Sequence, residues 1–569
     1  MSEDELNNIL GISSMEYYGL DMHTQDSSLS WLENGKILGS VAEERFSKHK
    51  NHTGFPWASL HYFFSEYNKK YDDIEMVALP GPLQQSLPKY KAFAKKIILN
   101  LRPGTKARKF AKEKLLIPIE KKKFHAVGHH QAHAADAYYP SGYKDAIAFS
   151  LGLGGIEADG VSASGASYLC QNDIIERIKL FSEGSFGSFY SYVTDGLGFR
   201  SGQEEYKTMH LSSLGNPNTK AYEKLLQLCP SINGTKIVKP KKPIAGGLFS
   251  MNSLQRTVFY NTKIIQDLIK RYSKNDVAAA AQKIIEEHIT KLVGNTLDDQ
   301  SQTALVLSGG IFHNVKLNKK LAALDKVKNI FISSNPGNGG TGHGAVLQAY
   351  GDLLGQDPCY KLSNAGVGPQ FIEEEILATL NKYKNKINFS KSENIAVDTA
   401  DLIHKGKIVG WFQGKMEFSQ KGLGNRSVLC DPSNLQTKDR LNLILKKHEE
   451  FIPFGASILF EKLDRYVEKP IESQFMSLSF DIVKNKEELA AVTHVDETAT
   501  IQTVTKEANG IYYDMIKAYE TLSGKPAVLN TSFNRKGLPI VCSPEDAIQH
   551  VLGNYIEALA IGNYMVTRN

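Results

Sequence analysis

Histidines gather in one short segment of the sequence, where their spacing could support metal chemistry. His125, His129, His130 and His133 fall within nine residues and lead into an alanine-rich run. If this segment is helical from about His129, then His129 and His133 lie one turn apart and can bind the same metal ion, while His130 points to another side. A simple cluster beside a basic surface helix is the alternative. The density of histidines favours a functional role.

Two glycine-rich turns could approach a phosphate group. Residues 308–314 follow a predicted strand, and residues 335–344 precede a helix that we expect to begin near Ala345. Glycine lets backbone N–H groups come close to a phosphate, and the start of a helix adds a partial positive charge. Neither turn matches the lysine-containing P-loop or the dinucleotide fingerprint. An ordinary α/β turn is therefore the alternative for each.

Two polar groups in the C-terminal part could bind an anion. Lys415, Lys421 and Arg426 lie close together in the sequence and could converge with backbone amides on a phosphate or carboxylate. Residues 530–535 follow a predicted strand and offer hydroxyl and amide groups. A solvated loop is the alternative for each group. The presence of both in one part of the chain favours a binding site.

Short apolar runs alternate with amphipathic stretches along the chain, which indicates an α/β protein. A helix is predicted over 276–293 from its apolar face. Between 353 and 369 the pattern breaks into Gly, Pro, Asn and Ser, and an amphipathic run begins at Ile372, which predicts a domain boundary. No short internal repeat is evident. The predicted buried strands are 9–12, 146–150, 304–308, 408–412 and 526–530.

Length and composition narrow the class of protein. A chain of 569 residues with 41% hydrophobic residues can form two to four domains with large cores, which excludes disordered and fibrous classes. The acidic first residues lack the features of a secretory signal, and no stretch approaches the roughly 18 apolar residues of a membrane span. The five cysteines are far apart and form no C-x-x-C pair. These features predict a cytoplasmic protein.

The net charge of +6 conceals one strongly basic segment. Residues 89–123 contain thirteen basic and two acidic residues, so this segment alone carries +11. Such a segment could attract nucleic acid or an anionic membrane. No RNA-binding motif accompanies it, and its apolar residues recur at helical spacing. We therefore interpret it as a solvated helical face that draws anionic small substrates, or an acidic partner chain, towards His129.

Taken together, these segments resemble one family over nearly the whole chain, the ATP-dependent carbamoyltransferases of natural-product and nodulation-factor biosynthesis. So many matches in order make the resemblance specific. The matching segments are Ile9-Leu-Gly-Ile, Glu43-Glu-Arg-Phe, His129-His-x-Ala-His-Ala-Ala, Gly187-Ser-Phe-Tyr-Ser, Leu307-Ser-Gly-Gly-x-x-x-Asn, Met416-Glu-Phe, Asn425-Arg-Ser, Pro453-Phe, Thr493-His-Val-Asp, Gln502-Thr-Val and Asn530-Thr-Ser-Phe-Asn.

The resemblance implies an α/β protein of two domains. Residues 1–360 would form an actin-like (ASKHA) domain, similar to the threonylcarbamoyl-transferring protein of tRNA modification. Residues 361–569 would form an α/β domain similar to the synthase of threonylcarbamoyl adenylate. In such enzymes the C-terminal domain makes carbamoyl adenylate from carbamoyl phosphate and ATP. The N-terminal domain then transfers the carbamoyl group to a hydroxyl or amine of a small molecule, with the help of a divalent metal such as Fe or Mg.

The resemblance also implies roles for individual residues of this chain. His129 and His133 would hold the metal. Residues carried over for catalysis are His130, Lys415, Lys421, Arg426, Lys446 and Ser532. Residues carried over for the nucleotide are Glu205, Lys207, Ser308, Gly309, Gly310, Asn314, Asn338, Asn530 and Asn534.

Several functional positions depart from the family pattern. One metal-binding aspartate is missing after the strand that ends at Ser150, where Glu157 and Asp159 could substitute, and the other appears as Asn338. Neutral ligands weaken a divalent site, because hard cations depend on carboxylate charge. Other family residues are replaced as well: glycines by Tyr206 and His210, and arginines by Ile452 and Thr500.

Three functional hypotheses follow from these departures. The first is an active carbamoyltransferase with an altered metal and nucleotide site. The second is a non-catalytic family member that acts as the subunit of an active homologue. The third is an enzyme repurposed for acyl-adenylate or acyl-phosphate chemistry on another substrate. A homodimer or a hetero-oligomer fits these hypotheses, whereas a membrane or a nucleic acid is not an expected partner.

Overall fold

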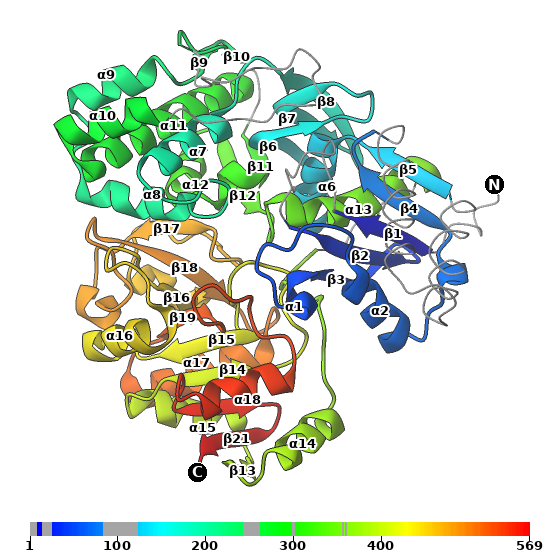
Figure 1. The fold of residues 1–569 in the computed structure, drawn as a ribbon, viewed down its shortest axis with the longest axis vertical. Helices are drawn as coiled ribbons and strands as arrows, with labels where there is room; N and C mark the ends of the chain where they lie inside the picture. The colour runs from blue at the N-terminus through cyan, green and yellow to red at the C-terminus, as the bar shows by residue number, and fades with distance from the viewer. Residues whose placement is uncertain are drawn as a thin grey trace.

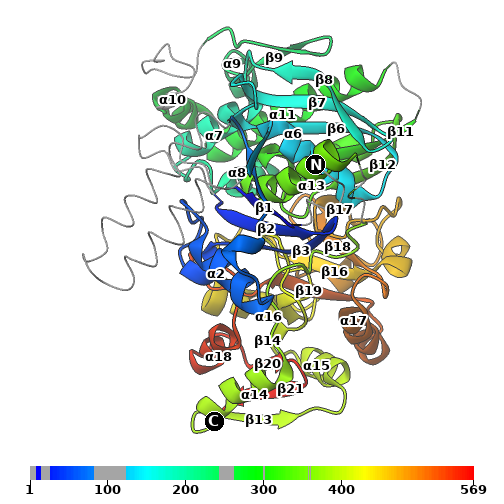
Figure 2. The ribbon, with the colours of Figure 1, turned by 90° about the vertical axis from the view of Figure 1, so that its right-hand side faces the viewer.

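The computed structural model describes residues 8–13, 26–82, 123–242, 262–298, 302–355, 358 and 361–569. It confirms the predicted α/β class. We call the described residues up to 355 the N-terminal half and residues 361–569 the C-terminal half. The C-terminal half lies at one end of the molecule, below the two sheets of the N-terminal half (Figures 1 and 2).

The first sheet of the N-terminal half has the strand order β3-β2-β1-β4-β5. Strand β2 is antiparallel to both of its neighbours, β1 and β3, whereas β4 is parallel to β1 and β5 is parallel to β4. The bounds are β1 (Asn8–Ile12), β2 (Ser28–Glu33), β3 (Lys36–Ala42), β4 (Met76–Pro80) and β5 (Lys123–Val127).

The second sheet repeats this topology, with the order β8-β7-β6-β11-β12. Its first three strands are antiparallel, and β11 and β12 follow β6 in parallel. Two sheets of one topology confirm the actin-like N-terminal domain that the family resemblance implies. The bounds are β6 (Asp145–Ile156), β7 (Ser162–Gln171), β8 (Ile174–Phe181), β11 (Thr303–Ser308) and β12 (Val327–Ile332), and a separate hairpin is formed by β9 (Ser231–Asn233) and β10 (Lys236–Val238).

Two adjacent helices, α6 and α13, connect the sheets. Helix α13 packs on β1, β2 and β4, and helix α6 packs on β6 and β11 (Figure 1). A second group of helices surrounds α11, which contains the predicted helix 276–293. The bounds are α1 (Glu44–Ser47), α2 (Trp57–Glu66), α6 (His129–Ser141), α7 (Phe186–Gly196), α8 (Glu205–Leu211), α9 (Lys220–Leu226), α10 (Lys263–Tyr272), α11 (Lys274–Leu297), α12 (Val315–Ala322) and α13 (Thr341–Leu354).

The glycines at the start of α13 allow unusually close packing. A Cβ atom on Gly344 would lie 1.8 Å from the carbonyl oxygen of Ala132 in α6, and a Cβ on Gly11 would lie 2.1 Å from the carbonyl oxygen of Gly342. No side chain fits at such distances, so the backbones meet directly. Helix α13 begins at Thr341, four residues before the predicted start at Ala345.

The C-terminal half contains one nine-stranded mixed sheet of order β13-β21-β20-β14-β15-β19-β16-β18-β17. Successive residues of β15 pack into different cores: Val428 joins the cluster that includes α18, and Leu429 joins the cluster that includes α15 and α17. Helices therefore cover both faces. The strands are β13 (Ile387–Lys391), β14 (Val409–Phe412), β15 (Arg426–Cys430), β16 (Gly455–Leu459), β17 (Leu478–Asp481), β18 (Thr498–Val504), β19 (Ala527–Ser532), β20 (Ala558–Ile561) and β21 (Tyr564–Arg568), and the helices are α14 (Glu373–Lys382), α15 (Ile395–His404), α16 (Leu435–Leu441), α17 (Gly510–Ser523) and α18 (Pro544–Leu552).

Three of the predicted buried strands lie within β1, β6 and β11, and the other two overlap β14 and β19, which each begin one residue later than predicted. The domain boundary predicted near residue 360 stays a prediction. Residues just after it form hydrogen bonds with the N-terminal half: Leu362 N donates to Pro140 O, and Ser40 N donates to Val367 O.

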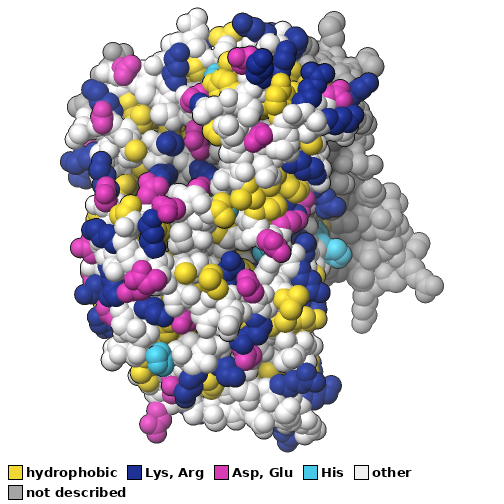
Figure 3. Space-filling view, turned by 90° about the vertical axis from the view of Figure 1, so that its left-hand side faces the viewer, with side chains coloured by type: hydrophobic (Ala, Val, Ile, Leu, Met, Phe, Trp, Pro, Cys, Tyr) yellow, Lys and Arg dark blue, Asp and Glu magenta, His cyan; other side chains and the backbone are white. Residues whose placement is uncertain are grey.

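The surface of the described chain mixes charges of both signs. Lysines and arginines alternate with aspartates and glutamates over the face drawn in Figure 3. The basic segment lies outside the described residues except for Lys123, the first residue of β5. Among the helices that the structure describes, none is long and apolar enough to span a membrane.

Candidate functional site

A cavity of about 2200 Å³ is lined by both halves of the chain. It collects most of the residues that the sequence singled out. From the N-terminal half these are His129, His133, Glu205, Gly310, Asn314 and Asn338, and from the C-terminal half Lys421, Lys446, Asn530, Ser532 and Asn534. We call this space the shared cavity.

The predicted pair of imidazoles forms at the start of α6. The helix begins at His129, as the spacing predicted, and the ring centroids of His129 and His133 are 4.9 Å apart. Both side chains are buried. Desolvation lowers the pKa of His129 well below its usual value and that of His133 to about 3, and neighbouring imidazoles add to both shifts. Both rings are therefore neutral and can offer a lone pair.

A buried polar network lies behind His133. Its Nδ1 atom is 3.0 Å from Ser308 Oγ, and the Asn338 side chain also hydrogen-bonds the ring. Ser308 Oγ in turn donates to the carboxylate of Asp136, which is 3% exposed. The sequence reasoning missed Asp136, although its position three residues after His133 places it on the same side of the helix.

The side chains that could bind a metal ion together with the imidazole pair are neutral. In the part of the chain that the structure describes, no three His, Cys, Asp or Glu side chains form a metal-binding group. Glu157 instead accepts from the backbone N–H of His130 at the start of α6, and the exposed Asp159 accepts from Val161 N. His129, His133 and the Asn338 amide fit a divalent cation only if bound phosphate oxygens supply the negative charge.

His130 lies outside the lining of the shared cavity, so its catalytic role stays a prediction. Its Nε2 atom is 3.1 Å from the carbonyl oxygen of Ala163, and its Nδ1 atom is 2.9 Å from Ser150 Oγ. Because a carbonyl only accepts, Nε2 carries the hydrogen and Nδ1 accepts from the serine. His130 therefore ties α6 to the second sheet.

The turn after β11 supports the cavity wall. Gly309 has a φ of +108°, and a Cβ there would lie 2.3 Å from the Leu151 carbonyl oxygen, so only glycine fits. Gly310 faces open space in the cavity. Ser308 and Gly309, predicted to contact the nucleotide, lie behind this wall.

Asn314 lines the cavity, but its side chain has structural partners. Its Oδ1 atom caps α12 by accepting from Leu317 N at 3.0 Å. Its amide also exchanges two hydrogen bonds with Gln282, at 3.0 and 2.9 Å. The predicted nucleotide contact therefore needs these bonds to rearrange.

Glu205 and Lys207 on α8 have different surroundings. Glu205 lines the cavity and accepts from Ser191 Oγ at 2.5 Å. Lys207 is outside the lining and pairs with Glu204 at 2.7 Å and with Glu449 of the C-terminal half at 2.8 Å. Although burial opposes its charge, these two hydrogen bonds outweigh it and raise the pKa of Lys207. Lys207 thus joins the halves instead of facing the cavity.

A lysine-centred cluster forms the C-terminal wall. Lys446 is 2% exposed, and its Nζ donates to Ser532 O at 2.6 Å, Ser532 Oγ at 3.1 Å and Asn534 Oδ1 at 2.8 Å. Desolvation lowers the pKa of Lys446 well below its usual value. Three acceptors match the three hydrogens of an ammonium group, so the contacts favour the charged form and fix Ser532 and Asn534.

Lys421 and Asn530 each have a hydrogen-bonding group that the described chain does not fully satisfy. Lys421 Nζ donates to the Met476 carbonyl oxygen at 2.5 Å, and desolvation lowers its pKa to about 8. Asn530 donates to Ser457 Oγ at 2.8 Å, while its own Oδ1 is buried without a hydrogen-bond partner in the described chain. Both line the cavity and can still receive a ligand.

Arg426 and Lys415 are not part of the cavity lining, so their catalytic roles stay predictions. The Arg426 guanidinium is fully buried, lies 3.6 Å from the centroid of the Phe412 ring and donates to the carbonyl oxygens of Gln413 and Gly414. It also donates to the carbonyl oxygen of Pro369 at 3.3 Å, so it braces the loop after β14 against the segment around Pro369. Lys415 is exposed and outside the lining.

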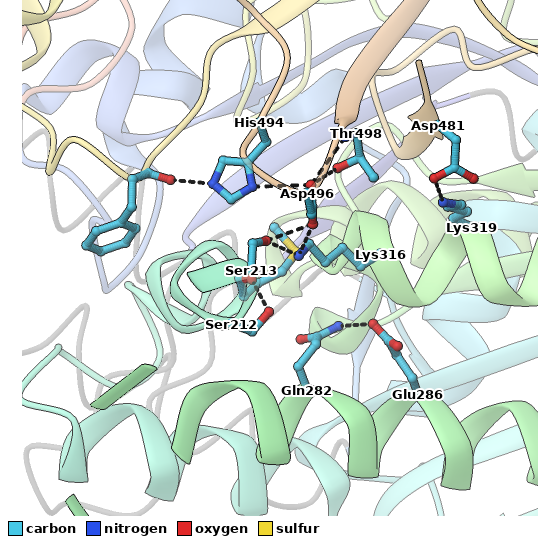
Figure 4. Close-up of polar contacts among 12 residues, drawn as sticks. Ser212, Ser213, Gln282, Glu286, Lys316, Lys319, Asp481, His494, Asp496 and Thr498 are labelled. Atoms are coloured by element: carbon cyan, nitrogen blue, oxygen red, sulfur yellow. Dashed lines mark hydrogen bonds and ion pairs between the residues drawn. The ribbon is translucent and has the colours of Figure 1, made fainter. Parts of the chain in front are cut away.

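A polar network joins the two halves beside the cavity (Figure 4). Asp496 pairs with Lys316 of α12 at 2.7 Å and accepts from Ser213 Oγ at 2.8 Å. Thr498 donates to its other oxygen at 2.7 Å, and His494 lies 3.4 Å away. Desolvation alone would raise the pKa of Asp496, but the hydrogen bond from His494 and the charge of Lys316 hold it well below its usual range.

We expect Asp496→Asn to lower the free energy of unfolding by about 1–3 kcal/mol at pH 7, because it leaves the partly buried Lys316 without its counter-charge. The folded-state pKa is depressed, so the contribution is complete above the ordinary pKa of 3.8 and declines as pH falls further. Urea unfolding of the unmodified protein and of Asp496→Asn at pH 7 and pH 3 measures the difference in the free energy of unfolding. Asp481→Asn is the matched control, since its pair with Lys319 is 60% exposed on the aspartate side. Equal losses in the two variants would contradict the prediction.

The residues that depart from the family pattern share one region. Tyr206, His210, Ile452 and Thr500 all line the shared cavity. The His210 ring lies 5.7 Å from the His494 ring, and burial, followed by the charge of His494, lowers the pKa of His210 to about 3. The departures therefore reshape the cavity where the two halves meet.

Comparison with known proteins shows which family the chain belongs to. Residues 16–347 match the carbamoyltransferase N-terminus model, and residues 400–568 match the carbamoyltransferase C-terminus model. The chain belongs to the carbamoyltransferase family. This carbamoyltransferase-family protein is 28% identical to an uncharacterized protein of Synechocystis, over 99% of this chain and 97% of that one.

The chain is also similar to relatives whose names describe a function. The family member is 28% identical to nodulation protein NolNO of Sinorhizobium fredii, over 98% of this chain and 82% of that one. It is 26% identical to 3'-hydroxymethylcephem-O-carbamoyltransferase of Streptomyces clavuligerus, over 46% and 48%. Among solved structures, component A of (R)-2-hydroxyglutaryl-CoA dehydratase from Acidaminococcus fermentans gives a TM-score of 0.33 at 15% identity, over 62% of this chain and 100% of that one.

Proposed function

We propose that this protein makes carbamoyl adenylate from carbamoyl phosphate and ATP and transfers the carbamoyl group to a hydroxyl or amine of a small molecule. In the transfer step the acceptor atom bonds to the carbamoyl carbon and loses its proton, while the bond to the AMP oxygen breaks and AMP leaves. A named relative, the cephem O-carbamoyltransferase, supports an oxygen acceptor.

The observation that carries this proposal is the shared cavity. The Lys446 cluster and Lys421 lie in its C-terminal wall, where cations and amides suit phosphate groups. The imidazole pair and Asn338 lie in its N-terminal wall. One cavity of this volume can hold the adenylate and an acceptor together, so the intermediate need not pass through bulk water.

A divalent cation, Fe or Mg, belongs to the proposal. His129, His133 and Asn338 would hold it together with phosphate oxygens of the nucleotide. When bound, such an ion polarises a carbonyl as a Lewis acid.

A non-catalytic role is the second candidate, and specific contacts favour it. Lys207 is occupied by two carboxylates, and Ile452 and Thr500 present no charge to the cavity. Such a protein would act as the subunit of an active homologue. A repurposed acyl-adenylate enzyme would instead keep the Lys446 cluster in use.

The direct test is incubation of the purified protein with ATP, carbamoyl phosphate and Mg²⁺ or Fe²⁺, followed by measurement of AMP and pyrophosphate. We expect pyrophosphate release above a heat-killed control, and AMP release as water takes the place of the acceptor and hydrolyses the adenylate. Release should be greater with Lys405→Met than with Lys421→Met, because Lys421 lines the cavity whereas Lys405 is an exposed lysine paired with Asp401. No release, no bound metal and copurification of a homologous chain would support the non-catalytic candidate. Release with another acid in place of carbamoyl phosphate would support the repurposed enzyme.

A further inference from the structure

A buried carboxylate stands behind the imidazole pair, and the proposed chemistry does not use it. The Asp136 side chain lies 2.9 Å from His343 Nδ1 and accepts from Ser333 Oγ at 2.6 Å and from Ser308 Oγ at 3.2 Å. Asp136 and His343 are each 3% exposed. A carboxylate buried this deeply needs hydrogen-bond donors on its oxygens, and these three groups supply them.

The carboxylate sets the direction of the next hydrogen bond. A serine hydroxyl has one hydrogen, and that of Ser308 can go to Asp136, to His133 Nδ1 or to the Pro336 carbonyl, which is 3.4 Å away. If it pointed at His133, the lone pairs of Ser308 would face the Asp136 carboxylate in a buried site. The charged acceptor therefore takes the hydrogen. Ser308 then has only a lone pair to offer His133.

This direction fixes the imidazole of His133. Its Nδ1 must carry the hydrogen that the Ser308 oxygen accepts, so its Nε2 must carry the lone pair. The Asn338 side chain also hydrogen-bonds the ring, and both His133 and Asn338 lie in the wall of the cavity. The neighbouring His130 has the opposite arrangement, because its Nε2 donates to the Ala163 carbonyl.

We propose that Asp136 is a positioning residue that acts through Ser308 to hold His133 as the Nδ1–H tautomer, with the Nε2 lone pair presented on the cavity side. Asp136 itself does not touch the cavity. This role deepens the proposed function, since an electron-pair acceptor in the cavity needs that lone pair, yet it can be tested in the free protein without any turnover.

The test is nitrogen NMR of the full protein labelled with ring-¹⁵N histidine, with His133→Gln and His130→Gln used to assign their signals. We expect His133 with a protonated Nδ1 and a bare Nε2, and His130 with the reverse. Ser308→Ala removes the link, and Asp136→Asn removes the charge while keeping the shape. Each should shift the His133 tautomer ratio by about tenfold or more towards Nε2–H, and the His130 signals should stay unchanged as a check on the fold.

Ser333→Ala is the matched control, because it removes another serine donor from the same carboxylate without touching His133. We expect its His133 signals to match those of the unmodified protein. A protonated Nε2 on His133 in the unmodified protein overturns the proposal. So does an unchanged tautomer in both Ser308→Ala and Asp136→Asn, or an equal shift in Ser333→Ala. Loss of AMP release with the tautomer intact would count against the proposed function alone.

Discussion

In the His133→Ala variant, carbamoyl transfer is expected to fall about a hundredfold or more, while carbamoyl adenylate still forms. His133 lies in the N-terminal wall of the shared cavity, and the groups suited to the phosphates of carbamoyl phosphate and ATP lie in the C-terminal wall. Loss of one positioned imidazole commonly reduces a step by this factor. Pyrophosphate release measures the first step, and mass spectrometry of adenylate and carbamoylated product measures the second.

The matched control is His288→Ala. His288 is half-buried on α11, and its Nδ1 hydrogen-bonds the Ile284 carbonyl oxygen at 2.9 Å, outside the cavity lining. Its removal should leave both steps within about threefold of the unmodified protein. Full transfer by His133→Ala, or loss of both steps together, would reject the division of labour between the two walls.

The Lys446→Met variant should lose adenylate formation by about a hundredfold or more without losing stability. The ammonium group holds Ser532 and Asn534 in place, so its removal frees these two side chains to leave the positions in which they face the cavity. Burial disfavours the charge of Lys446, as its depressed pKa shows, and methionine fills a similar volume. The melting temperature at pH 7 should therefore stay the same or rise, whereas pyrophosphate release should fall.

Lys405→Met provides the comparison for this change. Lys405 caps the C-terminal end of α15 in the same half, is 61% exposed and pairs with Asp401. Its replacement should alter neither release nor melting temperature appreciably. A Lys446→Met protein that melts well below the unmodified one, with activity reduced in proportion, would show that Lys446 acts through stability alone.

Local spacing explains which parts of the site could be predicted from the sequence. The His129–His133 pair depends only on one turn of helix, and the structure forms that turn where the histidine spacing placed it. Asp136 was equally accessible to this reasoning, but its importance depends on Ser308, which lies 172 positions away in the chain. Contacts of that separation leave no periodic signal.

Charge alone does not show which cations lie in the wall of the cavity. Arg426 and Lys446 are both buried cations in the C-terminal half, yet one donates to backbone carbonyl oxygens of two loops and the other lies in the cavity wall. The sequence also did not reveal that the sheet is duplicated. The two copies have the same strand order and direction, but their amino-acid sequences do not repeat. The family resemblance supplied the fold where periodicity could not.

The nine-stranded sheet has a consequence for biosynthesis. Strand β21 comes after every other strand in the chain, yet it pairs with β13, the first strand of its sheet, and lies between it and β20. The N-terminal sheets are complete once β12 has left the ribosome, and domains generally fold in that order. The Lys446 cluster is framed by β19, so the cavity wall it forms closes over a scaffold that is already folded. Ligand binding across the cavity therefore requires β19, which is synthesised after every strand of the two N-terminal sheets.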